Sequence, residues 1–248
     1  MTAPRLSITR IVNACTLIMI GDGAVLTDPY FSEHWFIPLR ERIGMKAAEL
    51  PMLSAIIGGH GVYDHWQPAS LTGYPFEEST PVFVATRSMK DNAKSAGFGN
   101  VEVLDWYETR RISERLITEV VPAQRSFRLK SNSYVLSSGE FRVFVGTEAR
   151  DIEPLRRYRA ERGAVNVALL PIDGSALAGH KLVMNASNAI EGARVLGAKV
   201  FIPIHYALKS IPILLRTPTS INHLLKLRQH VRDLEIVVLE TGDQWGPQ

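Results

Sequence analysis

Residues 53–65 read Leu-Ser-Ala-Ile-Ile-Gly-Gly-His-Gly-Val-Tyr-Asp-His, an apolar run that ends in two glycines and passes at once into polar residues. Residues 53–59 form a short run of mostly small or aliphatic side chains, which is typical of a buried β-strand. Strand ends and the loops after them are where α/β proteins collect their functional residues. We therefore expect His60, Asp64 and His65 to lie close together on a loop at a strand end.

The chain on both sides of this run predicts alternating strands and helices. Before it, β-branched and aliphatic residues predict strands at 7–12, 14–20 and 24–28. After it, strands are expected at 81–86, 101–106, 116–121, 134–137, 141–145, 167–172, 199–206 and 235–240. Helices are expected at 88–97, 152–162, 186–196 and 220–231. The front half reads mostly as hairpins and the back half as strands joined by helices. This order favours one domain, residues 1–248, with two stacked sheets flanked by helices.

Length and composition exclude several classes of protein. The chain has 248 residues, of which 46% are hydrophobic, so we expect a folded protein with a sizeable core rather than disorder. Cys15 is the single cysteine, which excludes an internal disulfide framework and indicates a reducing compartment. The first ten residues lack an apolar signal-peptide core, and no apolar run reaches about 18 residues. We expect a cytoplasmic protein without a membrane span.

The basic residues are unevenly distributed. The net charge is only +3, yet 20 of the 28 basic residues are arginine, and 11 of these arginines fall between Arg110 and Arg162. They form either a solvated basic face or a local preference for anions, because guanidinium groups match carboxylates and phosphates. Zinc-finger, basic-zipper and aromatic RNA-binding motifs are absent from the sequence, so no nucleic-acid partner is expected.

Asp64 and His65 place two metal-ligating side chains next to each other on one short loop. His205 stands near the end of another expected strand and offers a third ligand. Three protein ligands with an open position are what a hydrolytic zinc site needs. The alternative is that Asp64 caps the following turn and the histidines are only hydrogen-bonded.

The order of these features resembles that of the metallo-β-lactamase superfamily, over about residues 6–245. The resemblance is carried by the first hairpin with Asp28-Pro29, by residues 60–65 against the family's His-x-His-x-Asp-His, by 122–125 against Pro-Ala-Gln-His, by 146–148 against Gly-Asp-Thr, and by 203–205 against Pro-x-His. Within the superfamily, the sugar-lactone and N-acyl-phosphatidylethanolamine hydrolases are the most similar branch. The resemblance implies an α/β fold of metallo-β-lactamase type, a four-layer αββα sandwich.

Three of the family's metal-ligand positions hold other residues in this chain. Val62 stands at the second histidine, Arg125 at the later histidine and Thr147 at the bridging aspartate. An apolar side chain cannot coordinate a metal, and a guanidinium remains cationic and repels one. The resemblance therefore implies that the first metal site, of which only His60 remains, is lost.

The second metal site of the family retains Asp64, His65 and His205. These three imply one divalent ion, zinc before iron or manganese, with a metal-free cleft as the alternative. Arg125 could fill the missing metal's space, pair with Asp64, or hold a substrate carboxylate or phosphate. Glu148 reads as a further ligand, as a partner of Arg125, or as a solvated turn carboxylate.

Three functions stay open on these residues. The first is a one-metal hydrolase of an ester, lactone, amide or phosphodiester, in which Arg125 stabilises the developing anion. The second is a metal-free enzyme or lyase that uses Arg125 as anion holder and His60 as acid and base. The third is a non-catalytic protein that binds a ligand. We expect the first, with His60, Asp64 and Arg125 as catalytic residues and a small anionic molecule as substrate. Aromatic residues within 30–36 would suit a homo-oligomer contact.

Overall fold

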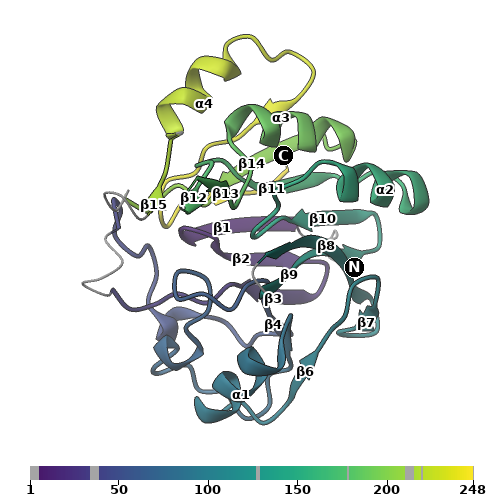
Figure 1. Ribbon diagram of the computed structural model, residues 1–248. Coiled ribbons are helices and arrows are strands. Elements are labelled where there is room, and N and C mark those ends of the chain that lie inside the picture. Colours follow the sequence, from purple (N-terminus) through teal and green to yellow (C-terminus); the bar gives the residue numbers. More distant parts are fainter. Residues whose placement is uncertain are drawn as a thin grey trace.

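Two seven-stranded β-sheets face one another in the computed structural model, which describes residues 6–33, 39–126, 129–177, 179–209, 215–218 and 220–247 (Figure 1). The first sheet contains, in spatial order, β17 (Gln244–Trp245), β1 (Leu6–Val12), β2 (Cys15–Ile20), β3 (Gly23–Thr27), β4 (Ala55–Gly58), β5 (Val82–Val84) and β6 (Val101–Val103). The second contains β16 (Glu235–Ile236), β14 (Val200–Ile204), β11 (Val167–Pro171), β10 (Phe141–Val145), β9 (Leu129–Ser138), β8 (Leu116–Ser126) and β7 (Thr109–Arg111). A small third sheet contains β13 (His180–Lys181), β12 (Ala176–Leu177) and β15 (Leu215–Arg216).

The helices of the described residues are α1 (Arg87–Ser95), α2 (Glu153–Arg162), α3 (Ala186–Val195) and α4 (Ile221–Arg228), with 3₁₀ turns η1 (Ala47–Glu49) and η2 (Pro68–Ser70). Two of them begin at side-chain caps, which satisfy backbone N–H groups that lack a helical partner. The hydroxyl of Thr86 accepts from the backbone N–H of Met89, and the amide oxygen of Asn185 accepts from that of Asn188. Gly197, expected to follow the end of α3, has φ +68, a conformation that glycine adopts at little cost.

The direction of the strands in the first sheet corrects the expectation that the front half is built mostly of hairpins. β1, β2 and β3 pair antiparallel, as predicted, but β3, β4, β5 and β6 pair parallel. Parallel neighbours cannot be joined by a tight turn and need a longer crossover. The long connection after β3 and the helix α1 between β5 and β6 serve as crossovers.

The second sheet repeats this order of directions along the chain. β7, β8, β9 and β10 pair antiparallel, and β10, β11, β14 and β16 pair parallel, so that α2, α3 and α4 lie in the crossovers. The parallel strands end at the same edge of the sheet. Residues that follow β10, β11 and β14 are thereby brought together.

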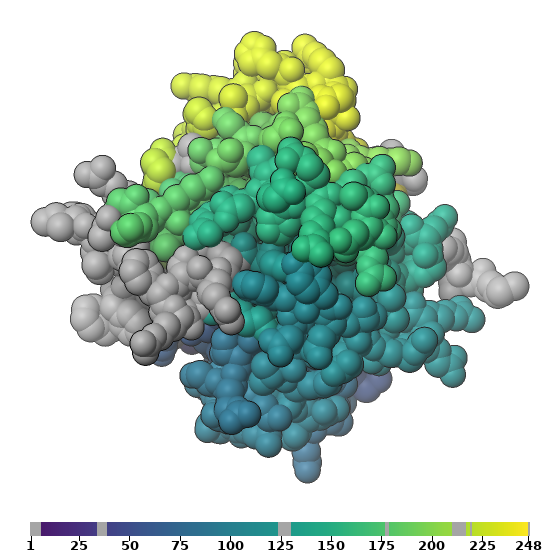
Figure 2. Space-filling model, turned by 45° about the vertical axis from the view of Figure 1, so that its right-hand side comes forward, coloured from purple at the N-terminus to yellow at the C-terminus, as the bar shows by residue number. Residues whose placement is uncertain are grey.

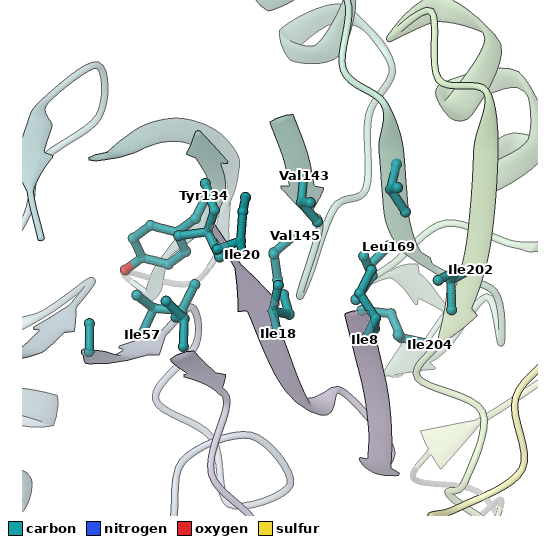
Figure 3. Packing of buried hydrophobic residues seen from close by; sticks show 14 of the residues in the cluster. Ile8, Ile18, Ile20, Ile57, Tyr134, Val143, Val145, Leu169, Ile202 and Ile204 are labelled. Carbon is teal, nitrogen blue, oxygen red and sulfur yellow. The ribbon is translucent and has the colours of Figure 1, made fainter. Parts of the chain in front are cut away.

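The core between the sheets is formed by aliphatic side chains from the inner faces of both. Ile18 and Ile20 of the first sheet and Val145, Leu169 and Ile202 of the second belong to one buried cluster. Figure 3 shows these side chains pointing toward one another from opposite sheets. Burial of a side chain of this size contributes about 1.5–3 kcal/mol, so this layer fixes how the two sheets are stacked.

The outer faces of the sheets are covered separately. Met89 and Ala93 of α1 pack with residues of the first sheet in one outer cluster, and Leu155 of α2, Ile190 of α3 and Leu224 of α4 pack in another with the second sheet. Figure 1 shows α1 on one side of the sheets and the other three helices on the opposite side. Figure 2 shows the segment around α1 at the bottom of the molecule and the segment of α3 and α4 at the top. The α/β four-layer αββα arrangement is thereby confirmed.

Two further expectations concerned an oligomer contact and a membrane span. Of the aromatic run proposed for an oligomer contact, Tyr30 is fully buried and Phe31 is half-buried, while 34–36 lie outside the described residues. In the ranges that the structure describes, none of the helices has the length and apolar character needed to cross a bilayer.

Candidate metal centre

The ends of several strands from both sheets meet at one edge of the sandwich. Polar residues follow these ends: Asn13 after β1, Asp28 after β3, His60 after β4, Thr147 and Glu148 after β10, Asp173 after β11, and His205 after β14. The loop 60–65 then turns back through backbone hydrogen bonds from the N–H groups of His65 and Trp66 to the carbonyl of Val62. This turn brings Asp64 and His65 to the same edge.

Backbone strain is concentrated at this edge. The left-handed residues here are Asn13 (φ 50), Asp28 (φ 41), Thr147 (φ 21) and His205 (φ 58). Each such conformation costs on the order of 1–3 kcal/mol for a residue other than glycine, and clusters of them occur at functional sites. Hydrogen bonds hold them: the Asp28 carboxylate accepts from the N–H of Gly59 at 2.7 Å, and the Thr147 hydroxyl donates to the carbonyl of Asn132 at 2.7 Å.

Four side chains converge on one point between these strand ends. The Nε2 atoms of His65 and His205 are 2.8 Å apart. Oε1 of Glu148 lies 3.1 Å from the first and 3.6 Å from the second. Oδ2 of Asp64 lies 3.5 Å and 3.4 Å from the same two nitrogens. Two imidazoles and two carboxylates therefore face each other, and all but Asp64 are nearly excluded from solvent.

A buried carboxylate stands behind each of these two histidines. Nδ1 of His65 is 3.2 Å from Oδ2 of Asp28, and Nδ1 of His205 is 3.2 Å from Oδ2 of Asp173. Asp173 is itself fixed by the backbone N–H and the hydroxyl of Ser175. Carboxylates in this position set the tautomer and ring direction of metal-ligating histidines, so that Nε2 is presented to the ion.

Asp64 and His60 complete the surroundings of the cluster. The amide of Asn13 donates to the backbone carbonyl of Asp64 at 3.2 Å and approaches its Oδ2 at 3.5 Å. Nδ1 of His60 is 3.5 Å from Oε1 of Glu148 and has no hydrogen-bond partner within the described part of the chain. A buried ring nitrogen of this kind is available to a ligand or to a proton.

The donor set fits a divalent ion of the zinc type. In a tetrahedral site with bonds of about 2.0–2.1 Å, neighbouring donor atoms are about 3.3–3.4 Å apart. The donor atoms of Asp64, His65 and His205 are 2.8, 3.4 and 3.5 Å from one another, and Oε1 of Glu148 lies 3.1 and 3.6 Å from the two histidine nitrogens. Histidine and carboxylate donors suit zinc, iron and manganese. These residues are therefore placed to hold such an ion.

The electrostatics of the cluster favour positive charge at its centre. Burial raises the pKa of the Glu148 carboxyl, but His60 and His205 outweigh burial and hold that pKa well below its usual range. Burial lowers the pKa of His65, but the carboxylates of Asp64 and Asp28 raise it to about 10. The pKa of His205 is raised in the same way, chiefly by Asp173 against the effect of burial. Without a metal ion, a proton held between the Nε2 atoms of His65 and His205, which are 2.8 Å apart, supplies positive charge that these carboxylates attract.

The structure brings together most of the residues named from the sequence. Asp64, His65 and His205 form one group of potential ligands, and His60, His65 and Glu148 form another. Glu148 is 4% exposed, so its interpretation as a solvated turn carboxylate is wrong. Thr147 faces a backbone carbonyl at the position where the resemblance expects a bridging aspartate, and the carboxylate comes from the next residue instead.

Two orienting residues and one amide were not identified as site residues from the sequence. Asp28 appeared there only as a strand end, and neither Asp173 nor Asn13 was identified as a site residue. Their common signal is their position one or two residues after a strand of the converging edge. Arg125 belongs by its backbone to β8, paired with Lys130, but its side chain lies outside the described residues.

The arginines of the basic segment are mostly paired with acids. The described ion pairs are Arg110–Glu102, Arg142–Glu119, Arg162–Glu119, Arg150–Asp151, Arg156–Glu153 and Arg157–Glu161. Pairs of this kind at a surface contribute little to stability. They favour a solvated, internally balanced face over an anion-binding patch.

Comparison with known proteins identifies the family of this chain. A family model described as the beta-lactamase superfamily domain matches residues 24–206. This match spans β3 to the residue after His205, and so includes the candidate ligands and both orienting aspartates.

Individual relatives are similar over nearly their whole length. A metal-dependent hydrolase of Rubrobacter xylanophilus is 24% identical over 238 residues, which cover 91% of this chain and 90% of the relative. The crystal structure of a possible metal-dependent hydrolase from Veillonella parvula has a TM-score of 0.80 at 16% identity, with 96% of this chain and 98% of that chain covered. An isothiocyanate hydrolase from Delia radicum gut bacteria has a TM-score of 0.77 at 15% identity, with 97% and 100% covered.

Proposed function

Because this chain belongs to the beta-lactamase superfamily, we propose that it is a metal-dependent hydrolase whose centre holds one divalent ion, with zinc as the first candidate. Asp64, His65, Glu148 and His205 are the proposed ligands. The observation that carries the proposal is the convergence of these four donors, with a buried carboxylate behind each histidine. The names of the relatives as metal-dependent hydrolases support the same reaction class.

The sharing of His65 supports one ion rather than two. The two groups of potential ligands, Asp64–His65–His205 and His60–His65–Glu148, both require this residue. Its Nδ1 faces Asp28, which leaves Nε2 as its one donor. A single nitrogen lone pair binds one ion, so the two groups compete for it. Val62, an apolar side chain, adds no ligand that would relieve this competition.

Hydrolysis follows from what the residues around the ion offer. When bound, a divalent ion at such a centre supplies Lewis acidity, which makes water nucleophilic near neutral pH. Asp28 and Asp173 keep the Nε2 atoms of His65 and His205 aimed at the centre. Asp64 is the most exposed of the four donors, and so lies on the side from which a substrate approaches. The substrate classes that suit this chemistry are esters, lactones, amides and phosphodiesters.

Two residues are proposed to act beside the metal ligands. His60 is placed to hold a proton at Nδ1 against Oε1 of Glu148 and to pass it to a leaving group. Arg125 is proposed on sequence grounds to hold the anionic group of the substrate, because its guanidinium cannot lose its charge.

Metal analysis tests the proposal directly. Protein purified without chelator and without a histidine tag is measured by elemental analysis, and we expect about one zinc, iron or manganese ion per chain. Asp64→Asn and His205→Ala should lose both the ion and hydrolysis of an ester, lactone and phosphodiester panel. The matched control is Asp91→Asn, which changes an exposed carboxylate of α1 and should keep both.

The possible outcomes separate the three functions. Chelation that abolishes hydrolysis, with zinc restoring it, supports the metal-dependent hydrolase. Metal-independent hydrolysis would refute the metal's role and favour a metal-free enzyme. Wild-type protein that neither binds a metal nor hydrolyses any of the panel would refute the proposal in favour of a non-catalytic protein.

A further inference from the structure

Arg10 is a buried cation that the proposed chemistry does not use. It lies in β1, where Leu6 and Ile8 pack in the core between the sheets. Because side chains alternate along a strand, Arg10 occupies a position at which this pattern would place another aliphatic residue. Its side chain is 1% exposed. Burial of a guanidinium is costly unless close contacts offset the lost hydration, so its contacts indicate its role.

The contacts of Arg10 lead to the residue that follows a proposed metal ligand. The guanidinium pairs with the Glu41 carboxylate at 2.5 Å and donates to the carbonyl of Leu239 at 3.2 Å. It also lies 4.0 Å from the centre of the Tyr206 ring, a cation–π contact. The Tyr206 hydroxyl donates to the same Leu239 carbonyl at 2.9 Å. Arg10 and Tyr206 are thus held against each other and against one backbone carbonyl.

Tyr206 directly follows His205, whose backbone is left-handed. This conformation persists only where neighbouring groups hold it. On the preceding side, the N–H of His205 donates to the carbonyl of Asn13 at 3.1 Å. On the following side, the ring of Tyr206 is held by Arg10. The peptide on each side of His205 is therefore fixed by the end of β1 and the residue that follows it.

The register of β1 changes near its end, where the strand holds the backbone around His205. The register of β1 with β2 shifts between Arg10 and Val12, an irregularity of the β-bulge type. Bulges re-aim side chains next to functional sites. Past the bulge, Asn13 reaches the backbone of Asp64. One strand end thus reaches both Asp64 and His205.

We infer that Arg10, held by Glu41 and Tyr206, is a positioning residue that directs the His205 imidazole toward the metal centre. The consequence for metal affinity rests on the proposed function. The consequence for the direction of the imidazole does not, because that direction also sets the contacts of the ring with Asp173 and His65. The two consequences can therefore be measured separately.

The test replaces the guanidinium with an apolar group of similar length, in Arg10→Met. Co²⁺ affinity and the Co²⁺ absorption spectrum report the ligand geometry. The side-chain ¹⁵N shifts of His205 in metal-free protein, assigned with His205→Gln, report the ring contacts. We expect Co²⁺ affinity to fall about 10–100-fold, as for other residues that orient metal ligands, with an altered spectrum and shifted His205 resonances. The matched control is Arg194→Met, which removes an exposed arginine paired with Asp233 and should change none of these.

Stability is measured alongside, because it separates positioning from a structural role. Unchanged Co²⁺ affinity and unchanged His205 shifts in folded Arg10→Met would overturn the inference, whatever the change in stability. If Arg10→Met does not fold, Tyr206→Leu removes the ring contact and is read by the same measurements. If wild-type protein binds no Co²⁺, the proposed function fails, and the His205 shifts alone decide the role of Arg10.

Discussion

Raising the pH from 7 to 9 should lower the free energy of unfolding of the metal-free protein. Burial lowers the pKa of His65, but the carboxylates of Asp64 and Asp28 raise it to about 10 in the folded protein, from a usual value of 6.5. The folded state therefore binds this proton more tightly than the unfolded state does. Stability from this source is complete below about pH 6.5 and is lost as the pH rises toward the folded-state pKa.

The size of the effect follows from the two pKa values of His65. The proton contributes about 4 kcal/mol at pH 7 and about 1 kcal/mol at pH 9. The expected loss between these pH values is therefore about 2–3 kcal/mol. For a chain of 248 residues this corresponds to a fall in Tm on the order of 5–10 °C. His205, whose pKa is also raised, acts in the same direction.

Urea unfolding at pH 7, 8 and 9 measures this loss after metal has been removed with chelator. The control is His65→Gln, which has no titrating group at this position and should show a much smaller decrease. Zinc should cancel or reverse the decrease in the wild-type protein, because a metal binds the deprotonated imidazole and its affinity rises as protons become scarcer.

Two results would refute this reasoning. One is a metal-free protein whose free energy of unfolding stays constant or rises between pH 7 and 9. The other is an equal decrease in wild type and in His65→Gln, which would assign the effect to other groups. Either result would mean that the carboxylates around His65 do not hold a proton at the proposed centre.

Three further substitutions test other parts of the molecule. Asp28→Asn removes the carboxylate behind His65, and competition with a chromophoric chelator should show zinc affinity about 10–100-fold lower, whereas unchanged affinity would contradict the orienting role. Gly59→Ala would place a Cβ 2.7 Å from the backbone carbonyl of Asn132, so urea unfolding should show a loss of about 1–3 kcal/mol, and wild-type stability would show that the loop yields freely. Leu169→Ala opens a cavity in the core between the sheets and should cost about 2–5 kcal/mol with the metal content of the folded protein unchanged; loss of metal without loss of stability would contradict this.

The strands could be predicted well where local pattern decides them. The first hairpin was expected at 14–20 and 24–28, and the structure has β2 at Cys15–Ile20 and β3 at Gly23–Thr27. The strand that forms β8 was expected at 116–121. It continues to Ser126, because the register with β9 shifts between Pro122 and Gln124 and the proline sits at this irregularity. Strand pairing across such a shift depends on the partner strand, which local sequence does not reveal.

Whether neighbouring strands pair parallel or antiparallel was harder to predict from the sequence than the strands themselves. β3, β4 and β5 are parallel, although the described residues between them contain only the 3₁₀ turns η1 and η2. Parallel pairing there depends on long connections, whose course is set by tertiary packing. A prediction from turn residues alone favours hairpins between such neighbouring strands.

Three of the candidate ligands could be predicted from the sequence, but the buried carboxylates around them could not. Asp64, His65 and His205 carry donor atoms, and two of them stand in a recognisable run. Glu148 and Asp173 are single carboxylates in ordinary surroundings of sequence. Their burial results from long-range convergence of strand ends, which places Glu148 4% and Asp173 1% exposed beside histidines distant in the chain. Their positions after strands mark them as candidates, but local sequence does not show that they are buried.

The convergence of strand ends at the candidate site costs free energy of folding, whereas the packing in the rest of the chain stabilises the fold. Asp28, Asp64, Glu148 and Asp173 bring four carboxylates to the three imidazoles, together with four left-handed backbone positions. Buried like charges and strained backbone both cost free energy, and the aliphatic layer between the sheets has to offset them. A bound cation removes part of the electrostatic cost and binds only the folded arrangement, so its binding free energy adds to the stability of the fold. Protons on the imidazoles do the same less completely, because each neutralises one charge and is lost at high pH. Metal and protons are therefore alternative stabilisers of one arrangement, and the dependence of stability on pH should reverse according to which of them is present.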